Sequence, residues 1–438
     1  MSRATVVVVN WNGAHLLPAC LDAHAKQTVD DAAVWVVDNA SSDGSLELLG
    51  RDYPWVRVLA NSDNRGFAGG NNTALREVTT PYAVLLNNDA TPEPDWLERL
   101  LAPFDGDGRL AAVTSKVLLE PRFLRLPLGT AGFTPGAGDT RALGVRIASV
   151  EVGGVDVTER IPWEKLAYGA EGSGPGRFRW TRPDGELLVP VTGAGPHRVV
   201  LRWAAEAGKP VRLGPADLAV TADWGSAVLD LPTGTPTVDV VNNVGSVVNT
   251  GGHGGDRGYQ EVDEGQYDEP AEVFALCGCA VAIRTEAGRA AGWFDEDFFL
   301  YYEDTDLSWR LRAAGWTIRY EPTAVVRHLH SATSVEWSPT FVFHVTRNRL
   351  LMLVKDATAA RARHEWRAFA VDTLLLLRLV VGQLRRGRRP DLARLRARLR
   401  VVASLLRLTP AALRGRRSLS RAAVVPRAEL ERWLVSPR

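Results

Sequence analysis

The sequence is poor in cysteine and in long apolar segments. Its 438 residues include only three cysteines, which are Cys20, Cys277 and Cys279. Three cysteines cannot form a disulfide framework, and this number suits a reducing compartment. Met1-Ser2-Arg3 runs straight into an expected strand without a charged-then-apolar leader, so we expect no secretory signal. The Leu374–Val381 run is interrupted by Arg378 and falls short of the ~20 apolar residues that a membrane-spanning helix needs.

A large excess of net charge is also missing, but the charge is unevenly distributed. The net charge is +1, yet from Arg385 onward sixteen arginines face three acidic residues. This tail therefore carries +13 and the remainder −12, so an acidic body precedes a basic tail. Hydrophobic residues at 45% and charged residues at 24% are typical of a globular protein. The length predicts two or more domains.

The N-terminal part alternates between expected strands and helices. The strands are Thr5–Val9, Val34–Val37, Val56–Leu59 and the run from Val84, and the helices are Leu16–Lys26, a segment with Leu46 and Leu49, and Thr73–Glu77. A glycine-rich loop, residues 64–72, precedes the last helix. This alternation predicts a mostly parallel sheet, with polar loops at the carboxyl ends of the strands where nucleotides bind.

The strand from Val84 ends abruptly in Asn87-Asn88-Asp89. A carboxylate at the carboxyl end of a buried strand can bind a divalent cation that is held against phosphates. Alternatively, these residues only cap the strand and begin a turn.

The character of the chain changes between residues 119 and 238, where Gly and Pro are dense and short β-rich runs replace helices. Recurring turn signals between these runs predict an antiparallel β-sandwich inserted into the α/β domain. We expect four segments: 1–118, 119–238 (the insert), 239–349, and a helical tail at 350–438.

Acidic residues at 303–306 open an expected helix, Leu307–Ala314, and strands are expected at Thr317–Tyr320 and Val325–His328. Asp306 and Arg310 are four residues apart, so a purely structural ion pair is one interpretation of this cluster. That interpretation explains Asp304 less well. Cys277-Gly278-Cys279 is spaced too closely for a zinc pair and is expected to form a tight strand, and Trp293 and Trp309 are expected in the core.

The tail shows helical spacing at Arg349–Lys355, Glu365–Leu384 and Asp391–Leu408. In the last segment an apolar stripe (Leu392, Leu395, Leu399, Val402 and Leu406) is accompanied by arginines elsewhere. This basic amphipathic pattern favours an anionic membrane surface, and the alternative is packing against the body or a partner helix.

Five motifs in order carry a family resemblance. They are Val-Val-Asn-Trp-Asn-Gly, Val-Val-Asp-Asn-Ala-Ser-Ser-Asp-Gly-Ser, Asn-Arg-Gly-Phe-Ala-Gly-Gly-Asn-Asn, Leu-Leu-Asn-Asn-Asp and Phe-Asp-Glu-Asp-Phe-Phe-Leu-Tyr-Tyr-Glu-Asp-Thr-Asp-Leu-Ser-Trp-Arg. The chain resembles glycosyltransferase family 2, nearest to its rhamnosyltransferase and galactofuranosyltransferase branch, over roughly Thr5–Val117 and Asn242–Arg349. The resemblance implies an α/β fold of the GT-A nucleotide-diphospho-sugar transferase type, here with the inserted β-sandwich and the C-terminal helical tail.

The resemblance also implies site residues. Asp38 corresponds to the aspartate that recognises the nucleobase, with Asn10, Asn12 and Asn88 in the same donor site. Arg65 lies in the loop that faces the ribose or diphosphate, although an exposed loop charge is the alternative.

Asn87 and Asp89 stand at the ends of the family's metal motif, and His328 matches its downstream histidine ligand. Asn87 departs from the usual aspartate, so a bound Mg²⁺ or Mn²⁺ is expected to be held more weakly. A histidine at a strand end is otherwise usually structural.

Asp304 aligns with the catalytic base, and Glu303 is the rival that helical geometry alone does not exclude. The expected reaction is inverting transfer of a sugar, rhamnose from dTDP-rhamnose or a sugar from UDP-galactofuranose or another UDP-sugar. The expected partners are a nucleotide-sugar donor, a lipid-linked or polysaccharide acceptor of the cell envelope and an anionic membrane surface, with no nucleic acid. The expected location is cytoplasmic, at the inner face of the plasma membrane. A non-catalytic glycan-binding protein whose insert binds sugar is the rival, and Asn87 is its only support.

Overall fold

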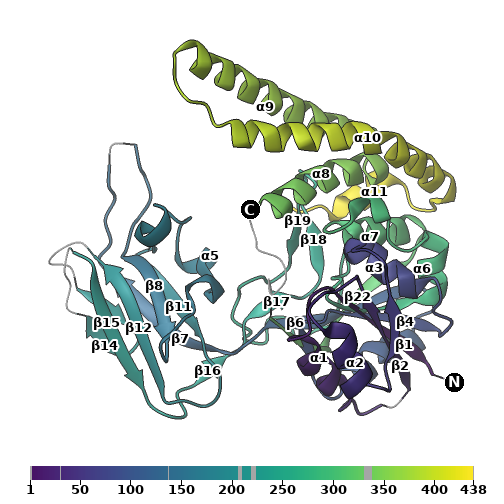
Figure 1. The fold of residues 1–438 in the computed structure, drawn as a ribbon, viewed down its shortest axis with the longest axis horizontal. Coiled ribbons are helices and arrows are strands. Elements are labelled where there is room, and N and C mark those ends of the chain that lie inside the picture. The colour runs from purple at the N-terminus through teal and green to yellow at the C-terminus, as the bar shows by residue number, and fades with distance from the viewer. Residues whose placement is uncertain are drawn as a thin grey trace. The chain divides into compact units, whose positions relative to one another are not determined.

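The computed structural model describes residues 2–29, 31–136, 138–205, 210–218, 223–329 and 338–437. The chain divides into two compact units (Figure 1). The first contains residues 1–117, 243–257 and 266–438, and the second contains residues 118–242 and 258–265.

The first unit begins with alternating strands and helices. They are β1 (Ala4–Asn10), α1 (Leu17–His24), β2 (Ala32–Asp38), α2 (Ser45–Asp52), β3 (Arg57–Ala60), α3 (Gly66–Leu75) and β4 (Tyr82–Leu86). β1 pairs in parallel with β2 and β4, and β2 with β3. The β-branched residues of these strands are buried, which gives the sheet its core. The register sets Asn10 opposite Asp38, so the polar ends of the two strands meet.

Later segments extend this sheet in the order β20-β22-β6-β21-β4-β1-β2-β3. The added strands are β5 (Ala90–Pro92), β6 (Leu110–Leu119), β17 (Val241–Asn243), β20 (Ala271–Glu272), β21 (Ala280–Arg284) and β22 (Thr317–His328), and the helices between them are α4 (Trp96–Leu101), α6 (Thr285–Ala291) and α7 (Glu303–Ala313). β18 (Ser246–Val248) and β19 (Gly254–Asp256) form a separate two-stranded sheet. β21 runs antiparallel to β4, and β22 pairs with β5 so that His328 faces Ala90. The predicted α/β fold class is confirmed.

Three local predictions were wrong. α3 begins at Gly66, not at Thr73, so the expected glycine-rich loop is mostly helix. A Cβ at Gly70 would lie 2.8 Å from Val9 Cγ1, so glycine here allows the helix to approach the sheet closely. β22 is one strand through Pro322, because β20 pairs with one half and β5 with the other. Cys277–Cys279, expected as a tight strand, precedes β21 as a turn.

The second unit is an antiparallel sandwich, as predicted. One sheet has the order β10-β8-β12-β15 with β9 beside β8, and the other has the order β11-β7-β13-β14 with β16 beside β7. The bounds are β7 (Phe123–Thr130), β8 (Arg146–Val152), β9 (Val155–Asp156), α5 (Trp163–Leu166), β10 (Arg179–Trp180), β11 (Asp184–Pro190), β12 (His197–Ala204), β13 (Val211–Leu213), β14 (Ala216–Leu218), β15 (Gly225–Leu231) and β16 (Thr237–Val238). Inward side chains of both sheets form one apolar core.

The tail belongs to the first unit and consists of α8 (Pro339–Asp356), α9 (Ala359–Arg385), α10 (Leu392–Ala422) and α11 (Arg427–Leu430). α10 runs through Pro410 to Ala422, beyond the predicted end at Leu408. α8 and α10 share a core with α7 that includes Trp309, which is fully buried as expected. No helix in the part of the chain that the structure describes is long and apolar enough to cross a membrane.

Candidate active site

The ends of β1, β2 and β4 bring together three predicted donor residues. The fully buried Asp38 carboxylate accepts hydrogen bonds from Asn10 Nδ2 at 3.2 Å and from the Ser41 N–H at 2.9 Å. Asn10 Oδ1 in turn accepts from Asn88 Nδ2 at 2.9 Å. This hydrogen-bonded chain fixes the side chains at the carboxyl edge of the sheet, where nucleotides bind in α/β folds.

The loop after β1 closes beside this chain. Asn12 has a positive φ of 51°, and its Oδ1 accepts from the Ser42 N–H at 2.8 Å. A Cβ at Gly13 would lie 2.4 Å from Asn88 Nδ2 and 2.5 Å from Asn10 Oδ1, so a side chain here would displace these two amide groups. The sequence interpretation gave Gly13 no role, although a glycine directly after Asn-Trp-Asn was the available signal.

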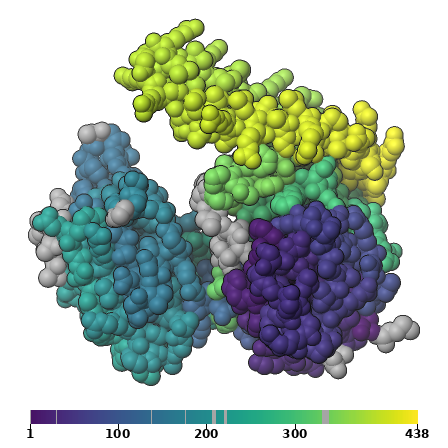
Figure 2. Space-filling model, viewed as in Figure 1, coloured from purple at the N-terminus to yellow at the C-terminus, as the bar shows by residue number. Residues whose placement is uncertain are grey.

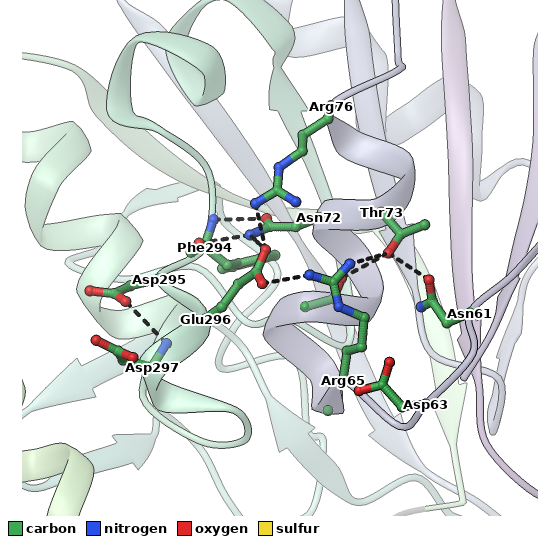
Figure 3. A network of polar contacts seen from close by, with 12 residues as sticks. Asn61, Asp63, Arg65, Asn72, Thr73, Arg76, Phe294, Asp295, Glu296 and Asp297 are labelled. Atoms are coloured by element: carbon green, nitrogen blue, oxygen red, sulfur yellow. Dashed lines mark hydrogen bonds and ion pairs between the residues drawn. The ribbon is translucent and has the colours of Figure 1, made fainter. Parts of the chain in front are cut away.

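Arg65, at the start of α3, is part of a polar network with the loop before α7 (Figure 3). Its Nη2 donates to Glu296 Oε2 at 2.8 Å, and Arg76 and Asn72 also bind the Glu296 carboxylate. Burial raises the pKa of Glu296, but the hydrogen bond from Asn72 and the charges of Arg76 and Arg65 outweigh it and lower the pKa overall. A role of Arg65 at the ribose or diphosphate stays a prediction, since here the guanidinium is engaged by Glu296.

The structure brings Asp89 and His328 together from sequence positions far apart. Their Oδ1 and Nε2 atoms are 3.1 Å apart, and both side chains are at most 10% exposed. The Asn87 side chain, in the same β4–β5 connection, makes no hydrogen bond to any described residue, so its amide oxygen is available. Among the described residues no group of three or more His, Cys, Asp or Glu side chains could hold a metal. One carboxylate, one imidazole and one amide nevertheless fit a hard cation that takes its other ligands from phosphates and water.

Glu303 and Asp304 begin α7 in different surroundings. Glu303 is buried, and its Oε2 atom has no hydrogen-bond partner among the described residues. Burial, followed by the charge of Asp304, raises its pKa well above the usual range. Asp304 Oδ1 accepts from the Thr305 N–H at 2.6 Å, and Oδ2 accepts from the Gly278 N–H at 3.3 Å. Burial still raises the pKa of Asp304, although these bonds favour its charged form.

Asp306 has a structural role. Its Oδ2 lies 2.6 Å from Arg310 Nη2, so the predicted ion pair is present. Its Oδ1 lies 2.8 Å from Lys355 Nζ on α8, a partner that sequence spacing could not reveal.

A turn joins the two acidic regions. The Gly278 N–H binds Asp304, and the carbonyl of Cys279 accepts from the Asn87 N–H at 2.8 Å. A Cβ at Gly278 would approach Phe67 Cζ to 3.0 Å, so a side chain fits poorly there. Burial raises the pKa of the Cys277 and Cys279 thiols well above the usual range, which disfavours thiolate chemistry.

Comparisons with known proteins agree with these motifs. The family described as "Glycosyl transferase family 2" matches residues 5–129. An N-acetylglucosaminyl-diphospho-decaprenol L-rhamnosyltransferase of Mycobacterium tuberculosis is 37% identical over 134 residues, which cover 28% of this chain and 41% of that protein. A teichoic acid poly(glycerol phosphate) polymerase of Staphylococcus epidermidis is 29% identical over 131 residues, covering 29% of this chain and 18% of that protein.

A solved structure of GalNAc-T7 with UDP, GalNAc and Mn²⁺ is 13% identical with a TM-score of 0.43, covering 81% of this chain and 50% of that one. The matched stretch spans less than half of each of the two curated relatives. The family match starts in β1 and includes the strand ends that carry Asn10, Asp38 and Asp89. Residues 5–129, which include these strand ends, therefore match glycosyl transferase family 2.

Proposed function

We propose that the chain transfers a sugar from a nucleotide-diphosphate donor to a hydroxyl group of an acceptor glycan, with inversion at the anomeric carbon. The observation that carries this proposal is the turn at Cys277–Cys279. Its Gly278 N–H binds the carboxylate of Asp304, and its Cys279 carbonyl binds the backbone of Asn87. The turn ties the proposed base to the strand end with the proposed metal ligands.

Asp304 is the proposed base. Its carboxylate takes the proton of the acceptor hydroxyl while that oxygen bonds to C1 of the sugar. The bond from C1 to the diphosphate breaks, and its electron pair leaves with the diphosphate oxygen. Attack from the opposite face inverts C1, so no second carboxylate is needed as nucleophile. Burial raises the pKa of Glu303 well above the usual range, and the backbone N–H bonds that favour a charged carboxylate are made to Asp304, so Glu303 is the less suitable base.

Asp89, His328 and Asn87 would hold the divalent cation, Mg²⁺ or Mn²⁺. The 3.1 Å between Asp89 Oδ1 and His328 Nε2 is compatible with two ligands of one ion. The neutral amide of Asn87 contributes less charge than an aspartate, so we expect weaker affinity for the cation than an aspartate at this position would give. When bound, the cation offsets the negative charge that develops on the departing diphosphate.

The proposed donor is dTDP-rhamnose, with UDP-galactofuranose or another UDP-sugar as the alternative. The rhamnosyltransferase relative supports the first choice. Because that relative is named for a diphospho-decaprenol substrate, it also supports a lipid-linked or growing cell-envelope glycan as the acceptor. Asn10, Asn12, Asp38 and Asn88 would form the nucleotide site.

The α9–α10 hairpin is proposed to hold the protein on the anionic inner face of the plasma membrane. Leu392, Leu399, Leu406 and Leu413 recur every seven residues on α10, and each is at least 42% exposed. This spacing keeps them on one face, and Val401, Leu405 and Leu408 pack into the core from the opposite face. α9 adds an exposed run that includes Leu374, Leu375 and Leu379. Figure 2 shows the tip of the yellow-green hairpin projecting from its unit.

A hydrolysis screen over nucleotide sugars tests the proposed function. Purified protein with Mn²⁺ or Mg²⁺ should release nucleoside diphosphate from one donor, dTDP-rhamnose first, and faster when an acceptor is present. NMR of the product should show the inverted anomer. Retention at C1, or no turnover of any donor with any acceptor, would refute the proposal and favour the glycan-binding alternative.

A further inference from the structure

The inserted sandwich contains a cavity of about 420 Å³, within the ~300–1,000 Å³ typical of small-molecule sites. It lies at one edge of β8. β10 pairs with Arg146 and Ile147, and β9 pairs with Glu151 and Val152. Among the described residues no strand pairs with Ala148 or Ser149 along this edge, and both line the cavity. The interruption between β9 and β10 therefore creates the cavity.

The cavity is rich in positive charge. Four arginines (Arg160, Arg177, Arg179 and Arg202) line it together with two acidic residues, Asp156 and Glu159. Arg177 is paired with Glu159 at 2.9 Å. Within the described parts of the chain, the other three guanidinium groups make no ion pair and no hydrogen bond. An excess of unpaired guanidinium groups around a concave surface favours an anion, which they can bind through charge-assisted hydrogen bonds.

Arg179 supports this view most strongly because it is half-buried. Burial, together with the charge of Arg177, lowers its pKa although Glu159 opposes this. Removing a cation from water without a bonded anion costs free energy, and a bound anion would offset that cost. The Arg179 guanidinium lies 5.6 Å from the ring centroid of Trp163, which holds it at the cavity.

Aromatic rings adjoin the arginines. Phe178 lines the cavity, and its ring centroid lies 5.8 Å from that of Trp224, which is 38% exposed. Arg202 lies 5.7 Å from the same Trp224 ring. Flat aromatic faces bind the C–H faces of sugar rings, and Ser149 supplies a hydroxyl group in the cavity. A simple anion site does not need such a surface.

We infer that the insert binds a segment of an acidic glycan, with its carboxylate or phosphate groups on Arg179 and Arg202 and a sugar ring against Phe178. The inference rests on the second unit alone. It stands or fails independently of the proposed glycosyl transfer.

Calorimetric titration of the full-length chain tests this inference with four probes. They are trigalacturonate, which carries carboxylates, glucose 1-phosphate, the neutral trisaccharide maltotriose, and inorganic phosphate. We expect one of the two acidic sugars to bind, with affinity that falls as salt rises, and the responding sugar identifies the anionic group. Maltotriose should bind much more weakly.

Three variants and a matched control locate the binding. Arg202→Gln and Arg179→Gln should each weaken binding of the acidic sugar by about tenfold or more, because a charge-assisted bond is lost. Phe178→Leu should weaken binding of the acidic sugar but not binding of inorganic phosphate. The control, Arg212→Gln, removes an exposed arginine on β13 of the other sheet and should change nothing. Arg202 is exposed, so its variant should fold even if Arg179→Gln does not.

Several results would overturn the inference. One is that neither acidic sugar binds, and another is that maltotriose binds as tightly as the acidic sugar. A third is that Arg212→Gln loses as much affinity for the acidic sugar as Arg202→Gln does. The last is that inorganic phosphate binds as tightly as the acidic sugar and that the variants leave its affinity unchanged. Binding of anionic vesicles that Arg179→Gln or Arg202→Gln weakens, with neither acidic sugar bound, would assign these arginines to lipid and would likewise overturn it.

Discussion

Two carboxylates stand side by side at the start of α7, and their surroundings give them different protonation behaviour. Asp304 accepts two backbone N–H bonds, which stabilise its ionised form, whereas Glu303 has a buried oxygen that no described residue contacts through a hydrogen bond. An acceptor proton needs an ionised carboxylate, so the environment distinguishes two neighbours that spacing alone could not.

The first prediction concerns this pair. Asp304→Asn should leave the fold and donor binding intact and lower transfer by about 10²-fold or more, because the amide accepts no proton. Glu303→Gln is the matched control and should cost far less, since Glu303 is expected to be protonated already. Steady-state kinetics of sugar transfer by both variants measure this difference. Near-normal turnover of Asp304→Asn would assign the role to Glu303 or end the proposal.

The pH dependence follows from the same residue. Because burial raises the pKa of Asp304, its base form is lost at a higher pH than that of an ordinary aspartate. Activity should therefore be present above this raised pKa and fall as the pH decreases through it. The acid limb of kcat/KM should disappear in the residual activity of Asp304→Asn. An unchanged limb would assign it to another group.

A second prediction concerns the proposed metal ligands. Chelator should abolish transfer, and Asp89→Ala should weaken binding of the nucleoside diphosphate in the presence of Mn²⁺. Asn87→Asp restores a second carboxylate and should tighten Mn²⁺ binding, measured by calorimetry, without changing the choice of donor. Full activity in EDTA would point to neutralisation of the leaving group by arginine or lysine. Unchanged Mn²⁺ affinity in Asn87→Asp would remove Asn87 from the ligand set.

At the scale of elements, glycine in α3 has a packing role. A Cβ at Gly70 would meet Val9 Cγ1 at 2.8 Å and Asn39 Nδ2 at 2.7 Å. Gly70→Ala should therefore lower stability by ~1–3 kcal/mol through overpacking. Gly50 in α2 is the matched control, because an added Cβ would have no atom of a described residue within 4 Å. Gly50→Ala should raise stability by ~0.5–1 kcal/mol. Denaturant-induced unfolding of both variants gives their free energies of unfolding. An equal change in stability in the two variants would contradict the packing argument.

α7 is fixed to α8 by a buried ionic cluster, which gives another prediction. Lys355 Nζ lies 2.8 Å from the fully buried Asp306 and 2.6 Å from Asp295, and Arg310 binds Asp306 from the other side. Lys355→Met should destabilise the protein by ~3 kcal/mol, because the lost cation leaves buried negative charge. A melting temperature within about a degree of the parent's at pH 7 would contradict this.

The contribution of this ionic cluster to stability should depend on pH in one direction. Burial opposes ionisation of Asp306, but the charges of Arg310 and Lys355 lower its pKa overall. The stability that ionised Asp306 contributes is therefore present above the pKa of the unfolded state, and it is lost as the pH falls through the lower pKa of the folded state. Asp356 is affected oppositely, since burial and the charge of Asp306 raise its pKa. The difference between Lys355→Met and the parent should therefore shrink at acid pH.

Elements with strong local patterns could be predicted from the sequence. β1, β2 and β4 are β-branched or apolar runs, and the polar residues that follow them mark their ends. The four-residue spacing of Asp306 and Arg310 likewise predicts their ion pair. α3 was placed too late because its glycines suggest a loop, and only the contact with Val9 explains them. Gly278 and Lys355 were missed because their partners lie on elements brought near by the fold, which no local pattern encodes.

At the scale of the whole molecule, the basic tail combines two surfaces on one helix. α10 contributes Val401, Leu405 and Leu408 to the core around α8, so deleting the tail would expose that core. Its opposite face keeps Leu399 and Leu406 exposed among arginines such as Arg400 and Arg407. Each arginine near an anionic surface contributes ~1 kcal/mol, screened within a Debye length, and inserted leucines add a term that salt does not screen. The membrane proposal therefore needs a test on the exposed face alone.

The double variant Leu399→Gln and Leu406→Gln provides that test, since both changes leave the buried face untouched. The parent should sediment with anionic vesicles at low salt, be largely released by high salt and bind neutral vesicles much less. The double variant should lose most of this binding, keep transfer to a short soluble acceptor and lose transfer to a lipid-linked one. Leu46→Gln, an exposed leucine on α2, is the control and should behave as the parent. Equal binding to both kinds of vesicle, or parental binding by the double variant, would discard the membrane surface as a partner. Loss of both transfer activities in a variant that melts like the parent would instead show that this face serves catalysis directly.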